Sequence, residues 1–237
     1  MGQEGDGAMK TFGDAITFIG HNLSFLLDKT GQQLELSGAA IGVSLVIAIP
    51  IGLWLGHIHR GAWFAISVSN VGRALPSLGV IAIGLAIFGL GFVNVLVALA
   101  VLAIPPLLTN AYVAIDGVDR EVVEAARGMG MSPLQILLRV ELPLGLPLLF
   151  AGIRTAAVYV VATATIASLA GGEGLGDIIF NQASYRLPGV VAAAIWVSAL
   201  ALAVEGAFAL LQRLVTPAGL RHRVPGIGPA GKPVDIG

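Results

Sequence analysis

The chain has 237 residues, of which 56% are hydrophobic and only 11% are charged. A soluble domain carries roughly a quarter charged residues, so this composition excludes an ordinary soluble protein and indicates one embedded in a membrane. The 13 Lys and Arg residues almost balance the 14 Asp and Glu residues, which excludes the concentrated basic surface that nucleic-acid binding requires.

The N-terminal segment, residues 1–35, is expected to precede the membrane domain. It lacks the order of basic and then apolar residues that marks a cleavable secretion signal. Within it, Phe12 to Leu27 place apolar side chains at helical spacing, interrupted by Asp14, His21 and Asn22. This pattern predicts an amphipathic helix lying on the membrane surface, and a sixth membrane span is the alternative.

Five apolar runs are long enough to cross the membrane, since a spanning helix needs roughly 20 predominantly apolar residues. They are Gly38 to Gly56, Ile66 to Leu90, Val93 to Ile115, Leu144 to Leu169 and Val190 to Leu211. The sequence NVGRALPS interrupts the second run, and the glycine-rich turn GLGF predicts a tight hairpin between the second and third runs. We therefore predict an all-α, polytopic membrane helical bundle of about five spans over residues 36–215.

The positions of Lys and Arg in the short connections set the expected orientation, because cytoplasmic loops carry an excess of these residues. One side of the membrane carries most of them: Arg60, Arg120, Arg127, Arg139, Arg213, Arg221, Arg223 and Lys232. The opposite side carries Lys10, Lys29 and Arg186. The N-terminus is therefore predicted to lie outside the plasma membrane and the C-terminus inside. Residues 216–237, rich in Pro and Gly, are expected to form a disordered cytoplasmic tail.

A polar island, EVVEAARGMGMSPLQILLRVELPLGLP, lies at residues 121–147 between two apolar runs, on the predicted cytoplasmic side. Val122 to Arg127 are good helix formers, and the two glycines that follow are expected to end this helix. A second helix is predicted to start at Ser132, with Pro133 at its first position and Gln135 placed for a capping box. The island is therefore expected to fold as two short helices joined by a sharp turn.

Two interpretations of this island are open. A solvated loop that only returns the chain is the first, because charged stretches between spans are usually of this kind. The length of the island favours the second, a surface that docks into another protein. Its small residues, Ala125 and Ala126 beside Gly128 and Gly130, would allow close approach to a groove on such a partner.

The order of residues in the island resembles a known family. Glu124-Ala125-Ala126, Gly130 and then Ile136 with Leu142-Pro143 resemble the EAA motif of the membrane subunits of binding-protein-dependent ABC importers. The resemblance implies the type I permease fold of these importers, with a coupling helix that docks into a cleft on a cytoplasmic ATPase. The residues assigned to this ATPase contact are Glu124, Ala125, Ala126, Gly128 and Gly130.

The resemblance extends over roughly residues 38–211. Asn70 and Arg73 to Leu78 resemble the broken second segment of the family, and Ala151 to Thr155 resemble the start of the span after the coupling loop. Gly171 to Asp177 resemble the GAGGLG stretch before the last span in the glycine betaine, choline and carnitine branch. Glu173 departs from that stretch and could alter an external contact with the binding protein.

The resemblance therefore implies a permease for osmoprotectants such as glycine betaine, choline or carnitine. It also implies several partners: an ATPase dimer that binds Mg-ATP, a second permease subunit, identical or homologous, and an extracytoplasmic substrate-binding protein. No catalytic, cofactor or metal site is expected in this chain, because it contains neither a phosphate-binding GxxxxGK[ST] loop nor HExxH, has no Cys, and its four His are not spaced as ligands. The alternatives are a permease for methionine or other amino acids, an ion channel and a membrane scaffold.

Several polar residues within the predicted spans are candidates for the translocation pathway: Asn70, Arg73, Pro76, Ser77, Arg154 and Glu205. A charge within a membrane is costly unless it is paired or faces water. Arg73, Arg154 and Glu205 are therefore interpreted as lining an inward-facing cavity or as forming an intramembrane ion pair. The alternative for Arg154 is that its side chain reaches toward the membrane interface.

Overall fold

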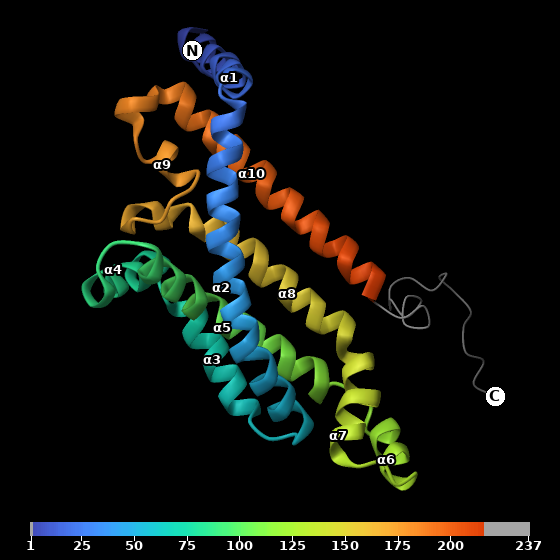
Figure 1. The fold of residues 1–237 in the computed structure, drawn as a ribbon. Coiled ribbons are helices and arrows are strands. Elements are labelled where there is room, and N and C mark those ends of the chain that lie inside the picture. Colours follow the sequence, from blue (N-terminus) through green and yellow to red (C-terminus); the bar gives the residue numbers. More distant parts are fainter. Residues whose placement is uncertain (1, 216–237) are drawn as a thin grey trace, which may run out of the picture.

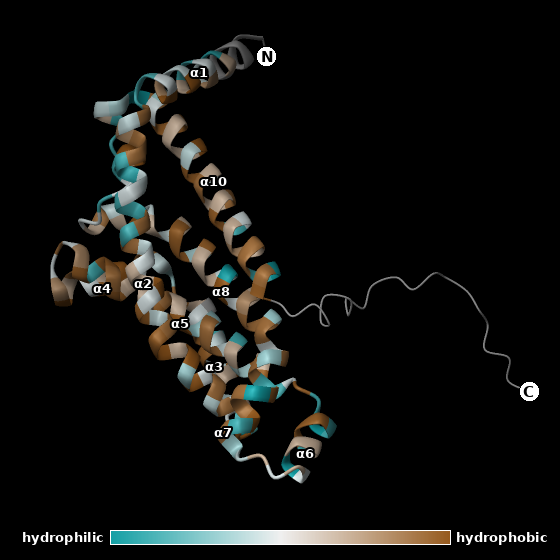
Figure 2. Ribbon diagram, turned by 45° about the vertical axis from the view of Figure 1, so that its right-hand side comes forward, coloured by the Kyte–Doolittle hydropathy of each residue, from teal (hydrophilic) through white to brown (hydrophobic). Residues whose placement is uncertain are grey.

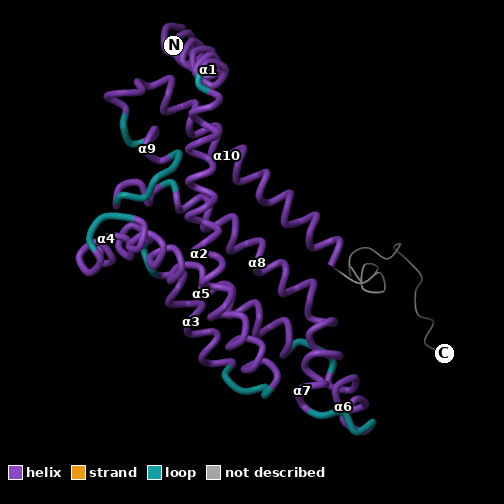
Figure 3. The backbone as a smooth tube through the Cα atoms, in the orientation of Figure 1, coloured by secondary structure: helices purple, strands orange, loops and turns teal. Residues whose placement is uncertain are grey.

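The computed structural model of the chain describes residues 2–215, without the side chains of residues 2–8 and Arg73. The predicted disordered tail at residues 216–237 lies outside the described residues. Between residues 2 and 215 the chain is helical and contains no β-strand, and Figure 3 shows that short loops join the helices. This agrees with the predicted all-α bundle.

The elements follow one another in a simple order along the chain. They are α1 (Gly2–His21), α2 (Leu23–His57), α3 (Ala62–Ala74), α4 (Ser77–Phe88), α5 (Phe92–Asp116), α6 (Arg120–Gly128), α7 (Pro133–Ile136), the π-helical turn η1 (Leu137–Glu141), α8 (Leu142–Ala164), the 3₁₀ turn η2 (Ile166–Ala170), α9 (Gly176–Ile179) and α10 (Gln182–Val215). In Figure 1, α1 and α9 lie near one end of the molecule, and α6 and α7 lie at the opposite end.

Four helical segments in the described chain are long and apolar enough to cross a membrane: Leu23–His57, Phe92–Asp116, Pro133–Ala164 and Gln182–Val215. The pair α3 and α4 would add a fifth span if it is counted as one. Figure 2 shows that hydrophobic residues dominate these helices, whereas hydrophilic residues gather on α6 and at the beginning of α2. The structure thus has four or five spans, which confirms the prediction of about five.

The second predicted run is broken into α3 and α4, which are inclined to each other by 88°. Leu75 adopts an extended backbone, with φ −71° and ψ 119°, and Pro76 precedes the first residue of α4. A residue before proline is driven out of the helical region by the proline ring. The predicted break at NVGRALPS therefore has a local cause at the bond between Leu75 and Pro76.

The amphipathic helix predicted for Phe12 to Leu27 has different boundaries in the structure. The chain breaks at Asn22, so its first part belongs to α1 and its last part begins α2. The side-chain amide of Asn22 donates to the carbonyl of Phe18 at 2.9 Å, which closes the last turn of α1. Residues 23–35 are continuous with the first span, and the boundary drawn between residues 35 and 36 falls inside α2.

Helix α5 lies at the centre of the bundle, in contact with α2, α3, α4 and α8. Gly52 and Gly56 of α2 face it so closely that an added Cβ would lie 2.8 Å from the carbonyl of Leu108 or Tyr112, respectively. Small residues four positions apart let membrane helices approach in this way. Gly145 of α8 makes a similar contact with the carbonyl of Ala114. At the end that carries α6, the three helices α2, α5 and α8 therefore form one tightly packed unit.

Candidate functional site

The polar island folds as predicted, with α6 followed by α7. Helix α6 begins after Asp119, whose side chain accepts a hydrogen bond from the amide of Glu121 at 2.9 Å. It ends at Gly128, and Gly130 adopts φ +82°, a left-handed conformation that glycine adopts without a steric penalty. The sharp turn between the two helices is therefore encoded by a glycine.

The predicted capping box at the start of α7 is confirmed. The hydroxyl of Ser132 accepts from the amide of Gln135 at 3.3 Å, and the side chain of Gln135 accepts from the amide of Ser132 at 2.8 Å. The chain then continues without interruption through the π-helical turn η1 into α8. The fourth span thus begins at Pro133, earlier than the predicted Leu144, and the second helix of the island is part of it.

A small apolar cluster supports the two helices of the island. Its buried members are Val118, Val123, Ala126 and Ile136, with Met131 and Val140 packed against them. Glu124, Ala125, Gly128 and Gly130 are exposed on the outside, as a docking surface requires. Ala126 differs from this expectation, because it is only 2% exposed. Its methyl group belongs to the cluster that holds α6 in place, and it is not available for contact with a partner.

A buried polar pair joins the base of the island to α2. The ring nitrogen Nδ1 of His57, the last residue of α2, lies 2.6 Å from Oε2 of Glu141, the last residue of η1. The Glu141 side chain is fully buried and that of His57 is 16% exposed. The ring of His57 therefore packs inward against a carboxylate at the end of α2.

A second histidine pair lies beside the first. His59 Nδ1 is 2.9 Å from Oδ1 of Asp116 at the end of α5, and both side chains are about one-third exposed or less. The two histidines and Arg127 border a cavity of about 400 Å³ between the end of α2 and the island. Polar contacts therefore tie the α2–α3 connection to both α5 and η1.

A cavity of about 550 Å³ lies between α3, α5 and α8. Its polar lining comes from neutral side chains: Ser69, Thr109, Asn110, Thr155 and Tyr159. The carbonyls of Pro105 and Pro106 accept hydrogen bonds from Thr109 and Asn110 at 2.9 and 2.8 Å. These two residues satisfy backbone oxygens of α5 while also offering polar surface to the cavity. Among the side chains that the structure describes, those lining the cavity offer polar groups without a formal charge.

Of the residues predicted for the pathway whose side chains are described, none is among those that line this cavity. Asn70 is exposed on α3, and Pro76 and Ser77 lie at the break before α4. Arg73 lies in the last turn of α3, and its side chain is outside the described part of the structure. The neighbours of these residues, Ser69 on α3 and Pro105 on α5, line the cavity instead.

Arg154 and Glu205 form an ion pair between α8 and α10. Their atoms Nε and Oε1 are 3.2 Å apart, and Arg154 also donates to Gln212 at 3.4 Å. Of the two interpretations given for these charges, the structure shows the ion pair. Neither residue lines the 550 Å³ cavity.

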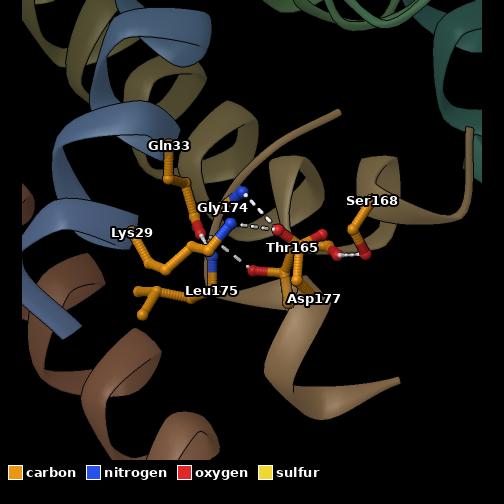
Figure 4. Close-up of polar contacts among 7 residues, drawn as sticks. All are labelled: Lys29, Gln33, Thr165, Ser168, Gly174, Leu175 and Asp177. Atoms are coloured by element: carbon orange, nitrogen blue, oxygen red, sulfur yellow. Dashed lines mark hydrogen bonds and ion pairs between the residues drawn. The ribbon is translucent and has the colours of Figure 1, made fainter. Parts of the chain in front are cut away.

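The opposite end of the molecule carries a second polar constellation, drawn in Figure 4. Gln33 of α2 is fully buried, and its side-chain oxygen accepts from the amide of Leu175 at 3.0 Å. Its amide group donates to the carbonyl of Val161 and to the hydroxyl of Thr165, at 2.9 and 3.2 Å. One turn earlier, Lys29 forms an ion pair of 2.7 Å with Asp177. The glycine-rich loop at residues 171–175 is therefore fastened to α2.

Sequence reasoning missed Gln33 and Glu141, and with Glu141 the contact of His57. Gln33 was placed in the segment before the membrane domain, although a glutamine four positions from Lys29 at the head of an apolar helix was a usable signal. Glu141 had no such signal, because acidic residues in a polar island are usually exposed. The partner of His57 became visible only when α2 and η1 were placed side by side.

The chain is similar in sequence to known membrane transport proteins. Residues 48–217 match the family described as binding-protein-dependent transport system inner membrane component. The glycine betaine/carnitine/choline transport system permease of Bacillus subtilis is 37% identical over 207 residues, covering 87% of this chain and 95% of that protein. The carnitine transport permease of Listeria monocytogenes is 38% identical over 208 residues, with coverage of 87% and 95%.

A solved structure shares the fold. An inward-facing form of the MetNI methionine ABC transporter superposes with a TM-score of 0.72 at 22% identity, covering 83% of this chain and 98% of that one. At this identity the likeness supports the fold alone. The family match spans the island, the central cavity and most of the helical bundle, and the chain therefore belongs to the binding-protein-dependent transport system inner membrane components.

Proposed function

We propose that the chain is the permease subunit of an ATP-driven importer for osmoprotectants such as glycine betaine, choline or carnitine. The relatives whose names include these substrates are 36–38% identical over most of their length. The structural observation that carries the proposal is the island, a self-supported helix with an exposed face, joined without a break to a membrane span. A passive return loop needs no buried cluster of its own.

The partners follow from this arrangement. A cytoplasmic ATPase dimer would hold Mg-ATP and receive the exposed face of α6 that carries Glu124 and Ala125. A second permease subunit, identical or homologous, would complete the pathway, and an extracytoplasmic binding protein would deliver the substrate. In this proposal α6 and α7 face the cytoplasm, and α1 and α9 face outward. The Lys and Arg residues in the connections support this orientation.

We propose that the cavity between α3, α5 and α8 is this subunit's half of the translocation pathway, with the other half supplied by the second permease subunit. Its volume of about 550 Å³ exceeds what one small osmolyte occupies, and its described lining offers neutral hydroxyl and amide groups. Tyr159, which is 40% exposed, adds an aromatic ring that can attract a quaternary ammonium group. A weak, uncharged site suits transport, because a solute must leave it as readily as it enters.

The proposal is tested by reconstituting the chain in proteoliposomes with the ATPase and binding protein of its transport system. Uptake of radiolabelled glycine betaine, choline and carnitine should require ATP and the binding protein, and an excess of methionine should not compete. Stimulation by methionine or another amino acid would support the alternative substrate class. Solute flux without the ATPase would indicate an ion channel. An absence of any uptake would favour the alternative that the chain is a membrane scaffold.

A further inference from the structure

We propose that α2 is a strut that links the outer loop at residues 171–175 to the coupling island, through one polar clamp at each end. The inference rests on the proposed function as a permease, and it concerns how binding-protein docking reaches the ATPase. Figure 1 shows that α2 runs from the end that carries α9 to the end that carries α6 and α7. From residue 33 to residue 57 it rises about 36 Å, at about 1.5 Å per residue. This length exceeds the hydrocarbon thickness of roughly 30 Å.

The outer clamp is centred on Gln33. A buried amide is tolerated when its hydrogen bonds are made, and Gln33 makes three, to Leu175 in the loop and to Val161 and Thr165 at the end of α8. The bond to the amide of Leu175 fixes the position of the loop relative to α2. Lys29 of α2 also pairs with Asp177, two residues beyond this loop, and Figure 4 shows this contact near that of Gln33. A partner that displaces the loop must therefore displace the head of α2.

The inner clamp is the contact between His57 and Glu141. The second oxygen of the buried Glu141 carboxylate has no hydrogen-bond partner among the described residues, so His57 is the group that offsets the cost of burying this carboxylate. Glu141 ends the π-helical turn η1, and such turns are often found at functional sites. The contact ties the end of α2 to the segment that leaves the coupling island.

Between the clamps, α2 is packed along α5 through the close contacts of Gly52 and Gly56. Packed helices of this kind move as units, because dense interfaces do not deform continuously. The two clamps act in series on one element. Loss of either clamp should therefore prevent docking of the binding protein from affecting the ATPase. Loss of the second clamp should then cause no further decrease.

The test uses the complete transporter in proteoliposomes, with Gln33→Leu, Glu141→Gln and the double variant. ATP hydrolysis is measured with and without the binding protein loaded with glycine betaine, choline or carnitine. We expect basal hydrolysis to remain within about twofold of the wild type and the stimulation by loaded binding protein to fall at least fivefold in each single variant. The double variant should match the single ones. A merely structural role would lower basal and stimulated hydrolysis together.

Matched controls are available next to each clamp. Gln32 adjoins Gln33, but its side-chain oxygen has no partner among the described residues. His59 also pairs with a carboxylate, but that carboxylate belongs to Asp116 of α5 rather than to the island side. Gln32→Leu and His59→Gln should keep the stimulation. Retained stimulation in both clamp variants, or a double variant as weak as the product of the two single effects, would overturn the proposal.

A second measurement needs only nucleotide. The chain has no Cys, so cysteines introduced at the exposed positions Ile58 and Leu138 can carry spin labels. The distance within one subunit should stay the same between the nucleotide-free and vanadate-trapped transporter, and it should change in Glu141→Gln. A changing distance in the otherwise wild-type transporter would contradict the inner clamp.

If Gln33→Leu does not assemble, Lys29→Gln tests the outer clamp. If no osmoprotectant stimulates the wild type, the substrate proposal fails, while the label distances still decide the inner clamp.

Discussion

The connections at the two ends of the molecule are supported in different ways. The polar island has an apolar cluster of its own, built on Val123, Ala126 and Ile136, so α6 and α7 fold against each other. The side chains of Gln33 and Lys29 fasten the glycine-rich loop to α2, and Leu175 of the loop is buried in an apolar cluster with Leu26 of α2 and Ala193 of α10. The apolar support of the island thus lies within the island, whereas that of the loop is shared with α2 and α10. The island can keep its shape when it moves, and the position of the loop depends on its neighbours.

The largest expected effect tests whether the island depends on its own cluster. Val123→Asp places an unpaired carboxylate among apolar side chains, which costs several kcal/mol. We expect loss of ATPase co-purification and cleavage of the α6–α7 turn by protease. Val122→Asp adds the same charge on a residue that is 42% exposed, and it should leave the turn resistant. Equal sensitivity of the two variants would show that the cluster does not hold the island.

A glycine pair on α2 tests the packing that joins the two ends. Gly56→Ala would place a methyl group 2.7 Å from Cβ of Ile115 and should destabilise the chain by about 1–3 kcal/mol. Gly42→Ala meets no atom within 4 Å, so the better helix propensity of alanine should stabilise α2 by up to about 1 kcal/mol. Thermal unfolding in detergent measures both. Shifts of the same sign would contradict the close approach of α2 to α5.

The turn of the island provides a third test. Gly130→Ala places a side chain at φ +82°, which costs about 1–2 kcal/mol. We expect faster hydrogen exchange across α6 and α7 and weaker ATPase binding. Gly128→Ala lies at the end of α6, without a positive φ and with no atom within 4 Å, and should leave hydrogen exchange across the island unchanged. A rigid, tightly bound Gly130→Ala variant would count against the left-handed turn.

The smallest effect is expected at the ion pair between Arg154 and Glu205, far from either clamp. Its side chains are 33% and 42% exposed, and partly exposed pairs contribute about 1 kcal/mol or less. A double-mutant cycle with Arg154→Glu, Glu205→Arg and the exchanged pair measures the coupling energy through uptake and thermal unfolding. The exchanged pair should recover most of what the single changes lose. Additive losses would mean that the two charges act independently.

Sequence reasoning predicted the features that depend on local order. The apolar runs predicted a number of spans within the observed range of four to five. Pro76 marked the break between α3 and α4. Gly130 and Ser132 marked the turn and the second helix of the island. These predictions succeeded because the decisive atoms lie within a few residues of each other. The break at Asn22 was missed because interrupted apolar spacing suits one surface helix as well as two helices joined by a bend.

The sequence by itself determined that the chain is a membrane protein, that it has about five spans, and that the polar island folds as two short helices joined by a turn. Only the tertiary structure decided that Ala126 faces inward, that Arg154 meets Glu205, and that Gln33 and Glu141 are buried at opposite ends of α2. These features join residues separated by 51 to 142 positions. Their burial depends on which helices pack together, and composition and periodicity carry no information about that.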